Sequence, residues 1–202
     1  MGTITLRNDI EVEDPLGLTL RFLDAYSSAE DYASPRPVTF DEQDLRLANQ
    51  WGARIAATEI AVILERRSEI EAALRAIEPS ASLAGATRSV PWSALTRLFD
   101  AFADIRGVGF SKMTKTLHRK RPALIPMLDR VIEAYLTTVD PDLPSAGSFG
   151  ERATALVRSY KQDLDRNRSA LRELKQALSR QGYPFSEVRI LDVVIWSVSA
   201  AP

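Results

Sequence analysis

The chain has no cysteine and a single histidine, His118, among its 202 residues. The absence of cysteine excludes disulfide bonds, thiolate metal sites, iron–sulfur clusters and a cysteine nucleophile. A single histidine without cysteine partners gives little support for a metal site. We therefore expect no metal bound by side chains, and expect His118 at the surface or lining a groove.

Long apolar segments are also missing. No stretch approaches the roughly 20 apolar residues that span a bilayer. The first 15 residues lack the basic start and apolar run of a signal peptide. These absences predict a cytoplasmic protein without membrane contact.

The chain has no large excess of charge of either sign, since its net charge is −1. The positive and negative residues are nevertheless unevenly distributed along the sequence. Residues 1–103 carry a net charge of −6 and residues 104–202 a net charge of +5. Seven basic residues fall within 104–130: Arg106, Lys112, Lys115, Arg119, Lys120, Arg121 and Arg130. Such a basic cluster is typical of a nucleic-acid-binding surface, although a solvated helix face has the same pattern. A pI near 6.0 argues against non-specific coating of DNA.

Helical patterns follow one another along most of the chain, and 45% of the residues are hydrophobic, which suffices for a core. We therefore expect an all-α fold, with residues 1–202 forming a single domain of two packed helical lobes. Residues 79–90 are small and polar and are the best candidate for a linker.

Helix starts are indicated by capping residues. The pairs Thr39–Glu42 and Ser68–Glu71 each match a capping box. Asp129 precedes another helical pattern and is expected to cap it.

A heptad seam runs through residues 157–178, within a long helical pattern that we expect to be broken once. It consists of Val157, Tyr160, Leu164, Asn167, Leu171, Leu174 and Leu178. The seam predicts packing on the protein's own core or, as the alternative, a homodimer contact.

The segment IRGVGFSKMTKTLHRKRPALIPMLD, residues 105–129, is the most informative part of the chain. Two helical patterns flank Gly107-Val108-Gly109, and together they predict a helical hairpin over residues 94–119. Glycine permits positive φ and close approach of the backbone to a ligand. The unpaired N–H groups of the second helix would lie at the positive end of its dipole, which suits a phosphate. The alternative is a tight turn that binds nothing.

Residues 105–112 resemble the helix-hairpin-helix motif L-P-G-V-G-x-K-T. Asp129 lies 22 positions after Gly107, as the catalytic aspartate does in the endonuclease III-like DNA glycosylases of the helix-hairpin-helix–GPD superfamily. The run of residues 124–129 is similar to the apolar run before that aspartate. The segment KRPALIPMLDRVI is also similar to a group of uncharacterised actinobacterial proteins.

The resemblance implies a helix-hairpin-helix DNA-glycosylase-like fold and a role for each matched position. The hairpin backbone would hold a phosphate of double-stranded DNA, often with a bound monovalent cation. Asp129 would be catalytic, because a fixed carboxylate stabilises the positive charge that develops on a sugar as its base departs. The candidate phosphate-binding residues are Gly107, Val108, Gly109, Ser111, Lys112, Lys115 and Arg119.

The chain departs from the family pattern at several of these positions. Ser111 stands where bifunctional members carry a Schiff-base lysine, so no lyase activity is expected from this site. Met113 replaces the usual alanine, Arg106 the usual proline, and Arg130 follows the aspartate where the family has other residues. Without cysteines there is no iron–sulfur cluster, and no other cofactor is expected.

Three functions remain open from the sequence. The leading one is a DNA-binding protein of the glycosylase-like fold, within which monofunctional DNA N-glycosylase activity through Asp129 is left open. The second is a non-enzymatic DNA-binding or scaffolding module that keeps only the fold and the hairpin; DNA repair is the process that the resemblance implies. The third is a helical protein that dimerises through residues 157–178 and does not bind nucleic acid.

Overall fold

The computed structural model of the protein describes residues 2–26, 34 and 36–199. The described residues form ten α-helices, one short 3₁₀ helix and two short strands, so the fold is mostly helical, as the sequence predicts. The first helices are α1 (Pro15–Tyr26), α2 (Glu42–Gln50), α3 (Ala57–Glu65), α4 (Arg67–Arg75) and α5 (Trp92–Asp100). They are followed by α6 (Phe110–His118), α7 (Arg130–Val139), α8 (Phe149–Arg166), α9 (Arg168–Arg180) and α10 (Glu187–Ser199). The strands β1 (Ile4–Thr5) and β2 (Glu11–Val12) pair antiparallel, and the 3₁₀ helix is η1 (Thr87–Ser89).

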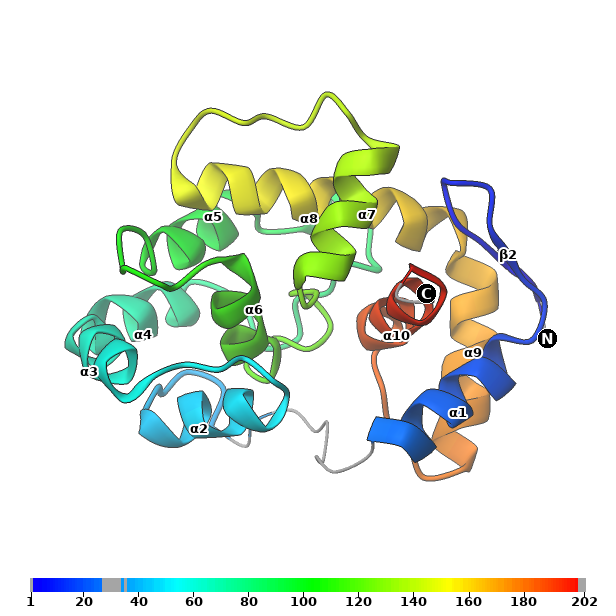
Figure 1. The fold of residues 1–202 in the computed structure, drawn as a ribbon, viewed down its shortest axis with the longest axis horizontal. Coiled ribbons are helices and arrows are strands. Elements are labelled where there is room, and N and C mark those ends of the chain that lie inside the picture. The colour runs from blue at the N-terminus through cyan, green and yellow to red at the C-terminus, as the bar shows by residue number, and fades with distance from the viewer. Residues whose placement is uncertain (1, 27–33, 35, 200–202) are drawn as a thin grey trace.

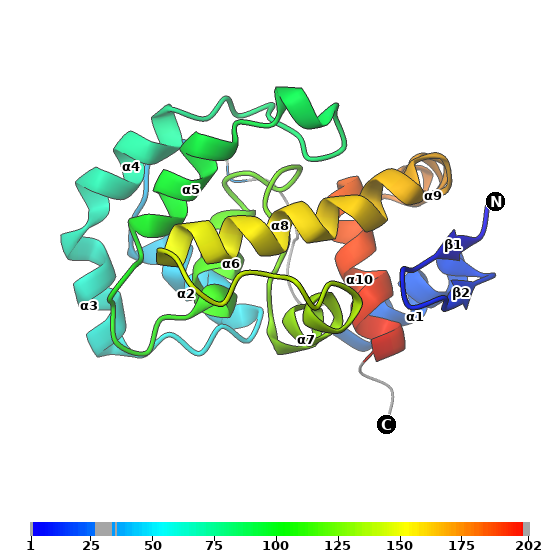
Figure 2. The same ribbon diagram turned by 90° about the horizontal axis from the view of Figure 1, so that it is seen from above.

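The helices gather at two ends of an elongated molecule (Figures 1 and 2). Helices α2 to α6 lie at one end, and α1, α9, α10 and the two strands lie at the other. Helix α8 runs lengthwise between the ends, packs against α5 at one of them and continues into α9 at the other. Helix α7 contacts both α8 and α10 in the middle. In the described part of the chain, no helix is long and apolar enough to cross a membrane.

The heptad seam packs on the protein's own core. All of its side chains are buried, and Val157, Leu171 and Leu174 have no exposed surface at all. The predicted single break falls at Asn167, between α8 and α9. The Asn167 amide bonds the backbone N–H and carbonyl of Thr5, at 2.8 and 3.0 Å. The seam side chains therefore pack on the protein's own core, and a homodimer contact through residues 157–178 stays a prediction.

Residues 79–90 form the connection between α4 and α5, and it is packed against the rest of the chain. Leu83 is fully buried, and its backbone N–H donates to the Ala123 carbonyl at 2.8 Å. The Lys161 ammonium reaches across from α8 to the carbonyls of Leu83 and Gly85, at 3.0 and 2.9 Å. This connection is therefore held in place from two sides.

Two of the expected helix starts differ from the structure. Helix α2 begins two residues later than Thr39 and Glu42 predict, because Asp41 is the cap and Asp44 completes the box. Helix α4 begins at Arg67 and has no side-chain cap, so the box expected from Ser68 is absent.

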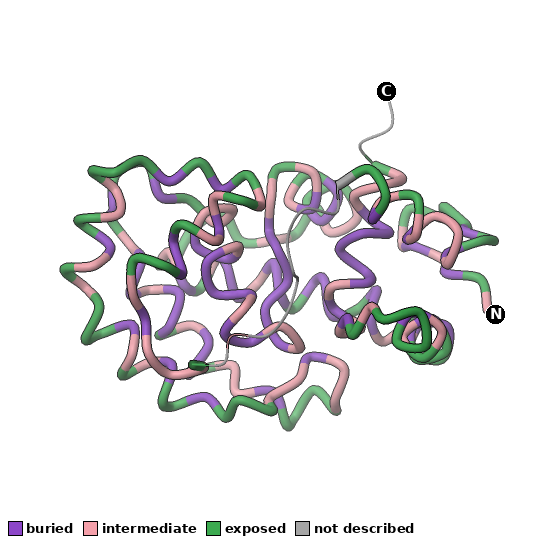
Figure 3. Tube along the Cα trace, turned by 90° about the horizontal axis from the view of Figure 1, so that it is seen from below, coloured by how far each residue is buried: buried purple, intermediate pink, exposed green. Residues whose placement is uncertain are grey.

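The core extends through both ends of the molecule. Figure 3 shows buried residues along the inner side of the chain trace and exposed residues along the outer side. The apolar face before the hairpin is buried, and it consists of Leu95, Leu98, Phe99, Phe102 and Ile105. Burial of this face anchors α5, and therefore fixes where the following turn reaches the surface.

Candidate nucleic-acid interface

The turn between α5 and α6 spans residues 101–109 and brings the predicted glycines to the surface. Asp104 and Gly107 both have left-handed backbone conformations, with φ of 59° and 83°. Gly107 and Gly109 are exposed, whereas Val108 is buried and donates its N–H to the Ile105 carbonyl at 3.0 Å. Val108 therefore anchors the turn, and only the backbone on either side of it can meet a ligand.

The first turn of α6 presents unpaired backbone donors. Gly109 is the N-cap residue, and no side chain caps the helix. Within the described residues, no acceptor serves the N–H groups of Phe110, Ser111 and Lys112. The space where a Gly109 side chain would lie is empty to 4 Å. Such N–H groups, at the positive end of a helix dipole, are suited to an anion.

The Lys112 side chain forms an ion pair within the protein. Its ammonium lies 2.7 Å from each carboxylate oxygen of Glu59, on α3. The same carboxylate accepts the Ala56 N–H at 2.8 Å and lies directly against Gly107, where an added Cβ would overlap Glu59 Oε1. The Lys112 side chain is 21% exposed and that of Glu59 is 14% exposed. Sequence reasoning missed Glu59, because nothing in the local pattern connects it with the hairpin.

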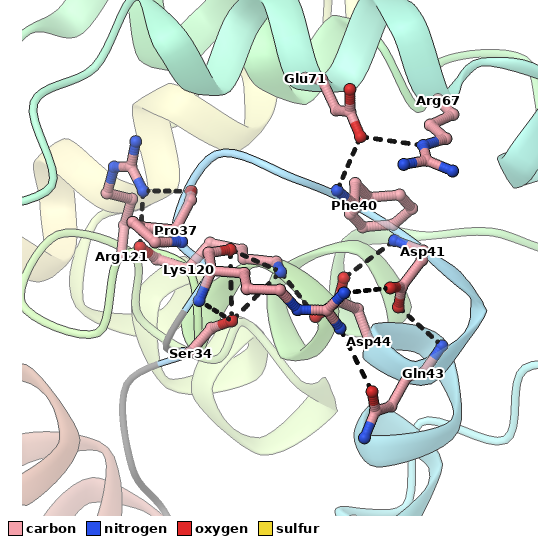
Figure 4. Close-up of polar contacts among 11 residues, drawn as sticks. Ser34, Pro37, Phe40, Asp41, Gln43, Asp44, Arg67, Glu71, Lys120 and Arg121 are labelled. Carbon is pink, nitrogen blue, oxygen red and sulfur yellow. Dashed lines mark hydrogen bonds and ion pairs between the residues drawn. The ribbon is translucent and has the colours of Figure 1, made fainter.

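Lys120 is a structural cation and is unavailable to DNA. Its side chain is fully buried and forms an ion pair with Asp44 of α2 at 2.6 Å. It also donates to the Ser34 hydroxyl and to the Arg36 carbonyl, at 3.2 and 3.1 Å. Figure 4 shows these groups converging on the ammonium.

Arg121 is also buried, with no exposed surface. Its guanidinium donates to four backbone carbonyls, those of Pro37, Leu74, Ile77 and Lys120, at 2.6 to 2.7 Å. The carbonyls of Leu74 and Ile77 lie in the last turn of α4 and just after it. The Pro37 carbonyl belongs to the segment that precedes α2, and Figure 4 shows its bond to Arg121. The basic tract of residues 119–121 is therefore mainly internal, which corrects the expectation from charge alone.

The other expected cations and Ser111 are partly exposed. The Arg119 guanidinium lies over the Trp51 ring, 5.9 Å from its centroid. Burial lowers the pKa of Lys115, the positive charges of Arg189 and Arg54 act in the same direction, and the nearby Asp129 opposes them. Lys115 is therefore the α6 cation whose charge is coupled to the candidate catalytic aspartate.

Asp129 caps α7, as the sequence predicts. One carboxylate oxygen accepts the N–H groups of Val131 and Ile132, at 3.0 and 3.1 Å. The side chain is partly exposed. Within the described residues, the second oxygen has no hydrogen-bond partner. Asp129 is therefore a fixed anion with one oxygen still able to meet a substrate.

The segment before Asp129 forms hydrogen bonds with side chains of α6. These bonds link the aspartate to the hairpin. The Leu128 N–H donates to the Thr114 hydroxyl at 3.0 Å. His118 Nδ1 lies 2.6 Å from the Ile125 carbonyl, and the histidine is only 1% exposed. The expectation that His118 lies at the surface or in a groove is therefore wrong.

Asp192 lies beside this segment and was not singled out from the sequence. It is 2% exposed, and one oxygen accepts the Met127 N–H at 3.1 Å. Burial raises its pKa to about 7, although the Arg189 charge and the Met127 N–H act in the opposite direction. An acidic residue in the middle of the apolar run of α10 was the available signal.

The described residues contain no group of three or more histidine, aspartate or glutamate side chains able to hold a metal ion. The candidate interface consists instead of the exposed hairpin backbone, partly exposed cations on α6, and the carboxylate of Asp129.

Comparison with known proteins identifies a family but does not assign an activity to it. A family model described as a family of unknown function, DUF6308, matches residues 19–199. No curated protein and no solved structure matches the chain. Because the family match covers most of the sequence, the chain belongs to the DUF6308 family.

Proposed function

We propose that the protein binds double-stranded DNA through the α5–α6 hairpin and has a helix-hairpin-helix, DNA-glycosylase-like fold. The observation that carries the proposal is the first turn of α6. Its N–H groups have no acceptor within the described residues, and they begin at an exposed glycine with open space around it. A phosphate oxygen is the ligand that this arrangement suits best. The two groups of helices would be the two lobes of the fold, with Asp129 between them.

The positive charge that supports this interface is smaller than the sequence suggests. Lys120 and Arg121 are buried, and Lys112 is paired with Glu59. Arg106 is exposed beside Gly107, and Ser111 offers a hydroxyl on the first turn of α6. A small number of phosphate contacts predicts moderate affinity with a shallow dependence on salt.

The test is fluorescence anisotropy on a labelled duplex, with and without an abasic-site analogue, over a series of salt concentrations. The decisive variant is Gly109→Glu, compared with Gly109→Gln as a control of the same size. Either side chain has room at position 109, where φ is −100°. A carboxylate at a helix N-terminus also favours the helix, so both variants are expected to fold.

We expect Gly109→Glu to weaken binding roughly tenfold or more, which corresponds to about 1.4 kcal/mol, because its carboxylate occupies the phosphate position. Gly109→Gln should lose much less affinity for DNA. Equal losses for the two variants would contradict phosphate binding at this turn. No binding by the wild-type protein at low salt would remove DNA as the ligand.

A second candidate function is monofunctional DNA N-glycosylase activity, favoured by the position of Asp129. Its carboxylate is fixed by two backbone N–H groups and is connected to the hairpin through Thr114 and Leu128. Ser111 cannot form an imine, so the reaction would be hydrolysis without strand cleavage. A fixed anion next to the departing base would stabilise an oxocarbenium-like transition state.

We expect Asp129→Asn to abolish base release while leaving DNA affinity unchanged, because asparagine also caps helices well. The measurement is release of the base from duplexes that carry a panel of damaged bases, with circular dichroism as the folding control. Release that persists in Asp129→Asn would exclude Asp129 as the catalytic group. Binding without release of any base would leave a non-enzymatic DNA-binding module.

A further inference from the structure

Glu59 occupies an unusual place beside the candidate phosphate site. It belongs to α3, yet its carboxylate lies against Gly107 in the hairpin turn and accepts two hydrogen bonds of 2.7 Å from Lys112. Lys112 is the third residue of α6, so its backbone N–H is one of the donors without an acceptor. An internal anion and the proposed site for an external anion are therefore next to each other.

The Glu59 carboxylate is well held in this position. Burial raises its pKa, but the hydrogen bonds from Lys112 and the Ala56 N–H, together with the Lys112 charge, bring the pKa below its ordinary value. Glu59 is therefore ionised at neutral pH. A lysine that donates to both oxygens of an ionised carboxylate has one donor left and contributes little net charge to its surroundings.

We propose that Glu59 sets the affinity of the hairpin for a nucleic-acid backbone, by holding Lys112 in an internal ion pair and away from a bound phosphate. This inference rests on the proposed function and identifies the residue that regulates it. Removing the carboxylate frees Lys112 to neutralise one more phosphate. Counterion release then predicts that the slope of log K against log salt steepens by about 0.9.

The test is a double-mutant cycle of Glu59→Gln and Lys112→Met, with duplex affinity measured by anisotropy from about 0.05 to about 0.5 M salt, over which the Debye length falls roughly threefold. Glutamine can still accept the Ala56 N–H and fill the space against Gly107, so Glu59→Gln removes charge and keeps packing. Glu59→Gln should bind more tightly, and the gain should grow as salt falls. A slope change of about 0.9 corresponds to about eightfold per tenfold change in salt.

Lys112→Met gives the second half of the cycle. In the wild-type background it leaves the Glu59 carboxylate without its cation beside the hairpin, so affinity should fall and the salt slope should become shallower. In the Glu59→Gln background it should remove the whole gain. Glu65→Gln is the matched control, since Glu65 is an exposed acid of α3 with no ion pair among the described residues.

The outcomes separate this inference from the proposed function. Wild-type binding that is sensitive to Gly109→Glu but unchanged by Glu59→Gln would overturn the role of Glu59. So would a double variant that keeps the whole gain of Glu59→Gln, because Lys112 would then not be the source of that gain. Glu59→Ala also removes the carboxylate and takes the place of Glu59→Gln if the glutamine variant fails to fold. An equal gain of affinity from Glu65→Gln would show that removal of any negative charge on α3 has the same effect, and would overturn the specific role of Glu59. Absence of any wild-type binding would overturn the proposed function itself.

Discussion

Asp192 is a carboxyl group enclosed in the centre of the molecule, where α10 meets α8 and the segment before Asp129. Four neighbours influence its charge: Arg189 on its own helix, the Tyr160 hydroxyl of α8, the Met127 N–H and Asp129. Burial outweighs the favourable ones and raises the pKa from 3.8 to about 7. The folded protein therefore holds a proton that the unfolded chain releases at lower pH.

This raised pKa predicts a specific dependence of stability on pH. Below pH 3.8 the carboxyl group is protonated in both states, so it has no effect. Between pH 3.8 and about 7 the unfolded chain ionises first, so stability falls as pH rises, and above about 7 the cost stays constant. The full cost is at most about 4 kcal/mol.

We therefore expect Asp192→Asn to be more stable than wild type at pH 8 and nearly equal to it at pH 4, because asparagine can accept the Met127 N–H without carrying charge. Urea unfolding of both proteins at several pH values measures the difference, and the shared pH dependence of other groups cancels in the comparison. A difference that does not change with pH would show that Asp192 is ionised in both states or neutral in both.

At the scale of elements, the α5–α6 hairpin assigns different roles to its two glycines. Gly107 needs a positive φ and also leaves room for Glu59, whereas Gly109 has an ordinary φ and open space. The sequence suggested equal roles for the two residues. The difference depends on α3, which lies against only one of them.

Gly107→Ala is expected to lower the free energy of unfolding by about 1 to 3 kcal/mol, because an L side chain is strained at φ 83° and overlaps Glu59. Gly109→Ala is the matched control and should change stability by less than about 0.5 kcal/mol. Chemical denaturation of the two variants gives both values. Equal stabilities would mean that the turn relaxes without cost.

Helix boundaries were predictable where the cap is local and less so where it is not. Asp129 caps α7, as its neighbours in sequence predict, and the long helical pattern is broken once, at Asn167, a position that the pattern did not specify. Glu71 matched a capping box with Ser68, but it instead accepts the Phe40 N–H at 2.9 Å (Figure 4). A tertiary partner competes with the local one, and the sequence pattern contains no information about that competition.

At the scale of the whole molecule, Arg121 joins three separate parts of the chain. Its guanidinium bonds carbonyls at the end of α4, in the segment before α2 and in its own turn after α6. Burial lowers the pKa of Arg121, because it costs free energy to enclose the charged guanidinium away from water. Its bonds to several carbonyls offset that cost, and hold α2, α4 and α6 together at one end of the molecule.

Arg121→Met is expected to destabilise the protein by about 3 kcal/mol or more, since it leaves several buried carbonyls without donors. Arg106→Met, at an exposed position, should change stability by less than about 0.5 kcal/mol. Thermal or urea unfolding compares the two variants. A small effect of Arg121→Met would mean that the carbonyls find other donors.

The sequence by itself determined the mostly helical fold, the hairpin, a single break in the long helical pattern of residues 148–180 and the cap at Asp129. These follow from periodicity and from residues a few positions apart, whose energetics are local. Only the tertiary structure decided which cations are available, because Lys112, Lys120 and Arg121 find their partners on helices far away in the sequence. Burial and pairing between distant segments decide whether a charge faces solvent, and a one-dimensional pattern does not encode that choice.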